Sequence, residues 1–465
     1  MLSPDFLHQQ GSSQVPSDCS PSAPKPRSQS RLNASRYEPR ASTVLQVLML
    51  IEVDRLAMLA GALDSAWVEH VLEGMSERLE NWVGAAGWSR RLQDGRLLVM
   101  VSREGDREDL MALTRELQQL MAEPLMIQDQ SYSLTVSIGA VLGTDMPPLA
   151  AEGVDAAGPS LDGGGSTGLA PWHEMWLHNA QTALLHAQGG DRQGCVLFDP
   201  SLHRELMDRW ELEMALRQAI AQQQLRVHYQ PIVFPSSGKV QGFEALCRWY
   251  HPKRGWISPA QFIPVAEEIG LIIELGQWVL ETACAQLKGW QRQGVVDKAA
   301  RVSVNVAPQQ LDNSDFVATV HGALTRTGLA PHCLSLEITE GAFAGNDAAI
   351  IPALEALKSL GVSISIDDFG TGYSSLSRLT QLPIDTLKVD RSFVEQMEKR
   401  GNDLIVIWTV LQLAENLGLT IIAEGASTRN HVEMLREIGE PLIQGYYFAH
   451  ALPPEMVPTW FREAS

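Results

Sequence analysis

The feature that most constrains the fold is a repeated alternation of short apolar strands and amphipathic helices in the C-terminal half of the chain. Roughly eight strand candidates, with helices between most of them, follow one another in about 260 residues, which predicts a (β/α) barrel. An open doubly wound sheet is the alternative, and it is less favoured because no G-x-G-x-x-G turn follows a strand. The strand candidates are RVHYQPIV, VQGFEALCRW, RVSVNV, LSLEIT, VSISID, TLKVD, LTIIAEG and LIQGYYF.

A polar residue lies at or near the C-terminal end of every strand candidate. In a barrel these ends converge on one face, which is where active sites are built. Carboxylates a few ångströms apart repel one another by on the order of several kcal/mol at an effective dielectric of about 20. One lysine cannot neutralise so many acids, so additional cations are expected. The residues are Gln230, Glu244, Asn305, Glu337, Asp367, Lys388, Glu424 and Gln444.

The donor atoms at these strand ends are oxygens, without histidine or cysteine. Oxygen ligands favour hard ions such as Mg²⁺ or Mn²⁺ over zinc. Paired ions roughly 3.5–4 Å apart in an acidic cleft are typical of phosphoryl chemistry. No Ser-His or Cys-His nucleophile pair is evident, so direct attack by an activated water is the simplest mechanism. Taken singly, Asn305 is equally compatible with a cap of the next turn, and Arg248 with a surface arginine stacked on Trp249.

Taken together, the motifs resemble those of one family. The triplet Glu244-Ala245-Leu246 lies within EALCRWYHP, and YQPIV, VNVAPQQL, LEITE, IDDFGTGYSSL, LKVDRSFV, IIAEG and QGYYF stand in the expected order around it. The segment from Ala215 to Phe461 thereby resembles the EAL domain of cyclic di-GMP phosphodiesterases. The resemblance implies a TIM-like barrel, two Mg²⁺ or Mn²⁺ ions, hydrolysis of cyclic di-GMP to linear 5′-pGpG, and a homodimer formed through this domain.

The resemblance also implies a role for each residue. Asp367 would bridge the two ions, Lys388 would hold the attacking water and the phosphate, and Glu424 would orient that water or act as base. Glu340 would brace the loop Phe369 to Ser375, which in the family couples dimer contacts to the metal site. The first metal would be bound by Glu244, Asn305, Glu337 and Asp367, the second by Asp367 and Asp368, and the substrate by Arg248, Gln230, Asp390 and Gln444.

Two positions depart from the family pattern. Ser427 replaces a second glutamate that usually follows AEG, and Ala307 replaces a serine after VNV. The first change removes a carboxylate from the edge of the site, so weaker turnover is expected. It also keeps open an alternative function, in which the chain is a catalytically weak or inactive cyclic di-GMP receptor that signals through its N-terminal half.

The N-terminal half has a different organisation. Residues 1–42 are rich in Ser, Pro, Gln and Arg and predict a disordered tail. Residues 43–200 have a mixed α/β pattern with a flexible insertion at about 146–169, and residues 201–224 predict a connecting helix before the barrel at 225–465. VSIGA and the helix before LFDP resemble the GGDEF domain of diguanylate cyclases.

The residues that cyclase chemistry needs are missing from this half. The signature hairpin turn has the sequence Gln93 to Leu97 (QDGRL), only Glu52 remains as an oxygen ligand, and the guanine-binding pair falls on Ala60 and Gly61. We therefore expect a degenerate GGDEF-like domain without cyclase activity. Its expected partners are GTP or an unidentified regulatory protein.

Composition excludes several other classes of function. With 36 bases against 55 acids and a net charge of −19, the chain is not expected to bind nucleic-acid polymers. Its 5 cysteines show no metal-binding or disulfide spacing. The apolar run Val44 to Ile51 is too short to span a bilayer. No transmembrane segment and a cytoplasmic location are the expectation.

Overall fold

The computed structural model forms two compact units, Met1–Phe198 and Asp199–Ser465, which are treated separately. The expected disordered tail and the whole of the expected insertion lie outside the described residues. The structure describes residues 44–56, 58, 65–104, 107–127, 130–143, 171–189, 194–222, 224–343, 347–370, 379–398 and 401–464.

The first unit contains a five-stranded mixed sheet in the order β2-β3-β1-β6-β7. Its centre is β1 (Val44–Val53), which pairs antiparallel with β3 (Leu97–Glu104) and β6 (Val136–Leu142). The other elements are β2 (Gly87–Arg91), β7 (Cys195–Leu197), the hairpin β4 (Leu125–Ile127) and β5 (Gln130–Tyr132), α2 (Ser65–Val83), η1 (Gly84–Ala86), α3 (Arg107–Ala122) and α4 (Pro171–Gly189).

The structure explains why glycine is present at two positions of this unit. Gly95 has φ +85° in the turn between β2 and β3, where the sequence predicts the hairpin. A Cβ at Gly139, within the VSIGA strand, would lie 2.2 Å from the carbonyl oxygen of Ala180 in α4. The glycine therefore allows α4 to pack directly on the sheet.

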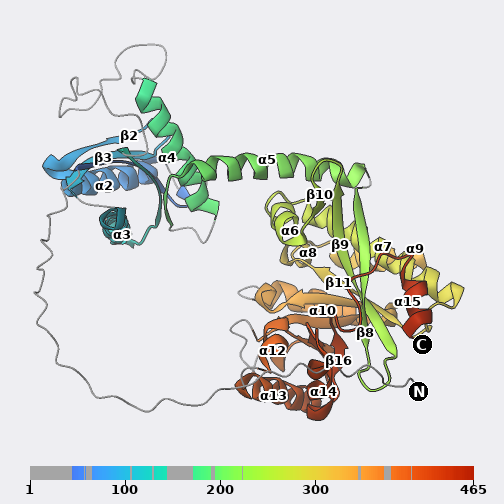
Figure 1. The fold of residues 1–465 in the computed structure, drawn as a ribbon. Helices are drawn as coiled ribbons and strands as arrows, with labels where there is room; N and C mark the ends of the chain where they lie inside the picture. The colour runs from blue at the N-terminus through green and yellow to red at the C-terminus, as the bar shows by residue number, and fades with distance from the viewer. Residues whose placement is uncertain are drawn as a thin grey trace, which may run out of the picture. The chain divides into compact units, whose positions relative to one another are not determined.

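The second unit is a barrel, as the sequence predicts (Figure 1). Its strands follow the order β10-β9-β11-β12-β13-β14-β15-β16-β8, and pairing of β8 with β9 closes the barrel. These strands are β8 (Leu225–Val233), β9 (Val240–His251), β10 (Gly255–Ile257), β11 (Arg301–Val306), β12 (Leu334–Thr339), β13 (Ser363–Phe369), β14 (Thr386–Val389), β15 (Thr420–Glu424) and β16 (Leu442–Gln444).

Helices cover the outside of the barrel. One of them is α7 (Ile272–Gln293), and its apolar face carries Leu280, Cys284 and Leu287 into the barrel's hydrophobic core. The others are α5 (Pro200–Ala221), α6 (Pro259–Glu268), α8 (Pro308–Leu311), α9 (Phe316–Thr327), η3 (Pro331–Cys333), η4 (Glu340–Phe343), α10 (Asp347–Ser359), α12 (Arg391–Gln396), α13 (Gly401–Leu417), α14 (Arg429–Ile438) and α15 (Val457–Ala464).

One barrel strand is reversed. β8 is antiparallel to both β9 and β16, whereas β9 and β11 to β16 are mutually parallel. Gln230 therefore lies inside a reversed strand, and Glu244 lies in the middle of β9. The sequence-based placement of these two residues at C-terminal strand ends is corrected, although both still face the common site.

Helix α5, expected as a connector, also belongs to the packed barrel unit. Leu216 and Ala219 of α5 lie in the barrel core. Arg254, after β9, forms ion pairs with Asp208 and Glu211 on the same helix. None of the described helices combines the length and apolar character that a membrane crossing needs.

Candidate active site

The strand ends of the barrel bring a buried lysine into a ring of carboxylates. Lys388 on β14 is 1% exposed. Its Nζ lies 2.6 Å from Glu424 Oε1, 2.9 Å from Glu337 Oε2, 3.1 Å from Asp367 Oδ1 and 3.8 Å from Glu244 Oε2. The Glu337 contact is a hydrogen bond, whereas the Asp367 and Glu424 oxygens lack hydrogen-bond alignment and are ion pairs. One ammonium group is thus shared by four acids from four strands.

Amide side chains hold the Glu244 carboxylate in place. Asn305 Nδ2 donates to Glu244 Oε1 at 2.7 Å, and Gln444 Nε2 donates to Glu244 Oε2 at 2.5 Å. Gln444 also donates to Gln230 Oε1 at 3.1 Å, and Gln230 donates to the carbonyl of Ala449 at 3.2 Å. Asn305 and Gln444 therefore fix the orientation of Glu244 through direct hydrogen bonds, and Gln230 supports it through Gln444.

Burial and mutual repulsion give the carboxyl groups of the site different pKa values. For Glu244, burial raises the pKa, but Lys388 and the two amide donors outweigh that effect and the net pKa is lowered. Burial raises the pKa of Glu337 well above its usual range, with Lys388 only partly compensating and Glu244 and Asp367 adding to the rise. Burial raises the pKa of Glu424 to about 8 despite Lys388. Burial therefore favours the protonated form of Glu424 at neutral pH and disfavours ionisation of Glu337.

A local irregularity turns two adjacent aspartates toward the same place. Side chains alternate faces along a regular strand, yet Asp367, Asp368 and Glu424 each offer an oxygen within 4.8 Å of the others. The register between β13 and β14 shifts between Ile366 and Phe369, and Asp368 has φ +55°. This bulge brings both aspartates into the site.

The donor set fits a hard divalent cation. Beyond the three clustered carboxylates, Glu337 Oε1 and Gln444 Oε1 are buried and accept no hydrogen bond from the described residues. Burial, followed by the negative charges of Asp367 and Asp390, also raises the pKa of Asp368. Unsatisfied buried oxygens and surplus negative charge are both relieved by a bound cation with oxygen coordination.

Three further residues singled out in the sequence lie around this cluster. Asp390 is the N-cap of α12 and accepts a hydrogen bond from the Ser392 amide at 2.9 Å. Glu340 Oε2 accepts a hydrogen bond from the Gly370 amide at 3.1 Å, at the start of the loop it was expected to brace. Residues 371–378 of that loop lie outside the described residues.

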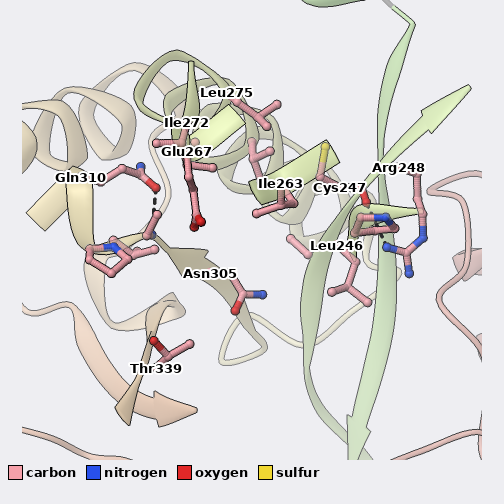
Figure 2. Close-up of a pocket in the computed structure, with 17 residues that line it drawn as sticks. Leu246, Cys247, Arg248, Ile263, Glu267, Ile272, Leu275, Asn305, Gln310 and Thr339 are labelled. Carbon is pink, nitrogen blue, oxygen red and sulfur yellow. Dashed lines mark hydrogen bonds between the residues drawn. The ribbon is translucent and has the colours of Figure 1, made fainter. Parts of the chain in front are cut away.

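A cavity of about 310 Å³ lies beside the cluster, between β9, β11 and helices α6 and α7. Figure 2 shows the Glu267 carboxylate extending toward the space between Ile263 and Asn305. Burial raises the pKa of Glu267. Arg248 borders the same cavity and donates to the carbonyl of Cys247 at 3.0 Å. No sequence pattern indicates this pocket or Glu267, because the pocket is lined by residues of β9, β11, α6 and α7 together.

The two positions that depart from the family pattern lie at the edge of this arrangement. Ala307 precedes α8 and offers no side-chain cap, and its amide donates instead to Gln310 Oε1 at 3.1 Å. Ser427 is exposed, and its amide donates to His431 Nδ1 at 3.4 Å. Neither residue contacts Lys388 or its carboxylates.

Comparison with known families identifies the barrel. The family model described as "EAL domain" matches residues 213–451, just over half of the chain. The chain belongs to the EAL domain family. The motif positions Glu244, Asn305, Glu337, Asp367 and Lys388 lie in this EAL domain, at the site described above.

Several curated proteins resemble most of the chain. They include the oxygen sensor protein DosP of Escherichia coli (33% identical, 90% of this chain, 49% of that protein). In Pseudomonas aeruginosa they include the bifunctional diguanylate cyclase/cyclic di-GMP phosphodiesterase MucR (33%, 85% of this chain, 55% of that protein) and the cyclic di-GMP phosphodiesterase NbdA (34%, 87% of this chain, 48% of that protein). The chain spans about half the length of these curated relatives.

Solved structures also resemble the EAL domain. One is described as "PaMucR Phosphodiesterase, c-di-GMP complex", with 40% identity and a TM-score of 0.52 over 53% of this chain and 99% of that one. Another is the EAL enzyme Bd1971 bound to cAMP and cyclic di-GMP, with 33% identity and a TM-score of 0.53 over 55% of this chain and 70% of that one.

Proposed function

We propose that this chain hydrolyses cyclic di-GMP to linear 5′-pGpG with the aid of two Mg²⁺ or Mn²⁺ ions. The observation that carries the proposal is the ring of four carboxylates around one buried lysine at the barrel mouth, beside a cavity of about 310 Å³. Relatives named as cyclic di-GMP phosphodiesterases support the choice of substrate.

Different side chains of the site would bind the ions, hold the phosphate and orient the attacking water. When bound, the ions polarise the phosphate and lower the pKa of water. Lys388, already charged and desolvated, would donate to the phosphate and hold the attacking water against it. Glu424 would orient that water or accept its proton, because it lies next to Lys388 at the rim of the cluster. The ions would be held by Glu244, Asn305, Glu337, Asp367 and Asp368.

Substrate contacts would come from the surrounding polar groups and the adjacent cavity. Arg248 would bind a phosphate, since a guanidinium provides paired donors. The cavity has the dimensions of a base site, and the Glu267 carboxylate would accept the N1–H and N2–H donors of guanine. Gln230, Gln444 and Asp390 would position the ligand or the lysine.

For the N-terminal unit we propose a degenerate GGDEF-like regulatory role without cyclase activity. At the hairpin between β2 and β3, Arg96 forms an ion pair with Asp94. The two charged groups of this turn are therefore paired with each other. Asp54 accepts hydrogen bonds of 2.7 Å from Thr135 and from Ser137, so this acid is used within the sheet. GTP or a regulatory protein at this unit, and a homodimer through the EAL domain, complete the proposal.

Assays on the whole chain of residues 1–465 test this function directly. Cyclic di-GMP incubated with Mg²⁺ or Mn²⁺ should give 5′-pGpG on chromatography, and EDTA should stop the reaction. Glu244→Ala should abolish hydrolysis. Glu281→Ala is a matched control, because that acid pairs with Arg326 on the barrel surface. Product formation that persists in Glu244→Ala would contradict the proposal. Tight binding of cyclic di-GMP without metal, together with no hydrolysis over hours when metal is present, would also contradict it and would favour the receptor alternative.

A further inference from the structure

The β8–β9 ribbon continues past the mouth of the barrel. β9 pairs with β11 only from Gly242 to Ala245, yet β9 runs on to His251. Over this extension β9 is paired on one side with β8 and on the other with β10. Figure 1 shows the two long strands β8 and β9 side by side, reaching toward β10. The extension forms a wall beside the acidic cluster.

One face of this wall is continuous with the site. Directly opposed residues on antiparallel strands share a face. Gln230 opposes Glu244 in the cluster, and two residues further along each strand, His228 opposes Leu246. The next pair on that face is Arg226 and Arg248. Four residues of strand separate Glu244 from Arg248, a distance of about 13 Å.

Two arginines directly opposite each other, the exposed Arg226 and the half-buried Arg248, favour a bound anion. Like charges in this position are destabilising. Neither guanidinium forms an ion pair with a carboxylate of the described residues. Arg248 is partly buried and burial lowers its pKa, which means that its charge is incompletely hydrated. A phosphate between the two guanidinium groups would satisfy both.

Aromatic side chains border this arginine pair. Trp256 on β10 opposes Tyr250 on β9, with ring centroids 5.2 Å apart, and the Trp256 ring lies 5.6 Å from that of His228. Trp256 is 56% exposed and Tyr250 is 46% exposed. Large exposed rings beside paired cations are the combination that binds a base and its phosphate.

We propose that Arg226, Tyr250 and Trp256 form a second nucleotide subsite of the EAL domain. Arg226 joins Arg248 on the phosphate that is not cleaved, and the exposed rings stack on the second guanine. The first guanine occupies the cavity near Glu267, on the other side of Arg248. The subsite rests on the proposed function, because it takes half of the same cyclic dinucleotide.

Steady-state kinetics of the whole chain of residues 1–465 with Mn²⁺ test the subsite. Arg226→Gln and Trp256→Ala should each raise KM for cyclic di-GMP about tenfold, with kcat within about twofold. Arg226→Lys should recover much of the loss, since it keeps the charge. Hydrolysis of bis(p-nitrophenyl) phosphate, which has one phosphate and no purine, should be unaffected by either substitution.

Matched controls separate this effect from general damage. Trp210→Ala removes a tryptophan with the same 56% exposure from α5, and Arg429→Gln removes an exposed arginine from α14. Both should leave KM unchanged. If the wild type hydrolyses cyclic di-GMP while Arg226→Gln and Trp256→Ala keep the wild-type KM, or lose kcat instead, the subsite is wrong and the proposed function stands.

A different result addresses the function itself. If the wild type binds cyclic di-GMP in EDTA and also fails to cleave it when Mg²⁺ or Mn²⁺ is supplied, the hydrolase assignment fails, and the same variants should raise the dissociation constant about tenfold. Unchanged dissociation constants there would overturn the subsite. A wild type that neither binds nor cleaves the dinucleotide overturns both.

Discussion

Replacing Lys388 by methionine should destabilise the metal-free protein strongly at pH 8. The ammonium is 1% exposed and has four carboxylates within 3.8 Å. At an effective dielectric of about 20, an ion pair at 3.1 Å, the distance from Lys388 Nζ to Asp367 Oδ1, contributes about 5 kcal/mol before desolvation is subtracted. Removing one partner of a buried pair typically costs about 3–5 kcal/mol, and we expect a loss in that range.

The cost should depend on pH, with a sign set by the acids. Glu337 and Glu424 have folded-state pKa values above the ordinary value of 4.5, with Glu424 at about 8. At a pH between the ordinary pKa and the raised folded-state pKa, the folded state binds more protons than the unfolded state, so these groups lower the free energy of unfolding as pH rises. Without Lys388 their pKa values rise further. The destabilisation should therefore be smaller at pH 5 than at pH 8.

Urea unfolding in EDTA, followed by circular dichroism, measures this difference in the barrel transition. Lys358→Met is the matched control, because Lys358 pairs with Asp385 at 32% and 31% side-chain exposure and should contribute less than about 1 kcal/mol. If Lys388→Met costs no more than the control at pH 8, or costs the same at pH 5 and pH 8, the electrostatic account of the cluster is wrong.

Two further outcomes follow from the same geometry. Mg²⁺ binding should release protons and tighten as pH rises through about 8, because the positive charge of an ion held by Asp367 and Asp368 favours loss of the proton from the nearby Glu424. Calorimetry in buffers of different ionisation enthalpy measures this, and binding without proton release would contradict it. Gly370→Ala should lower activity and cost about 1–2 kcal/mol or more, since φ is +102° and the new Cβ would lie 2.9 Å from Phe393. Gly238→Ala has φ +65° in open space and serves as its control; equal losses in the two variants would refute the clash.

The barrel could be predicted because its signal is local and repeated. Each strand is a short apolar run, and each helix has its own period, so the count alone indicates the architecture. The reversal of β8 has no such signal, since RVHYQPIV has the same alternation in either direction. The sequence therefore selected Gln230 correctly as facing the site but placed it at the wrong point of its strand.

The composition of the site was also accessible, whereas its geometry was not. Oxygen donors near the ends of successive strands indicate a cation-binding site. The shift in register that turns Asp367 and Asp368 together depends on pairing with β14, which lies beyond a loop. The pocket at Glu267 depends on β9, β11, α6 and α7 at once, and the pairing of Arg226 with Arg248 depends on strand register. These are long-range contacts that no single stretch of sequence specifies.

The reversal of β8 also decides where a mechanical signal can enter the barrel. In an all-parallel barrel, the chain enters its first strand at the end remote from the active site. Here α5 ends at Ala221 and the chain enters β8 at Leu225, on the catalytic side. The Gln224 carbonyl accepts from the Tyr250 amide at 3.1 Å, which couples that entry point to the β9 wall. A rotation or shift of α5 would thus reach Gln230 along a few residues of one strand, without crossing the barrel core.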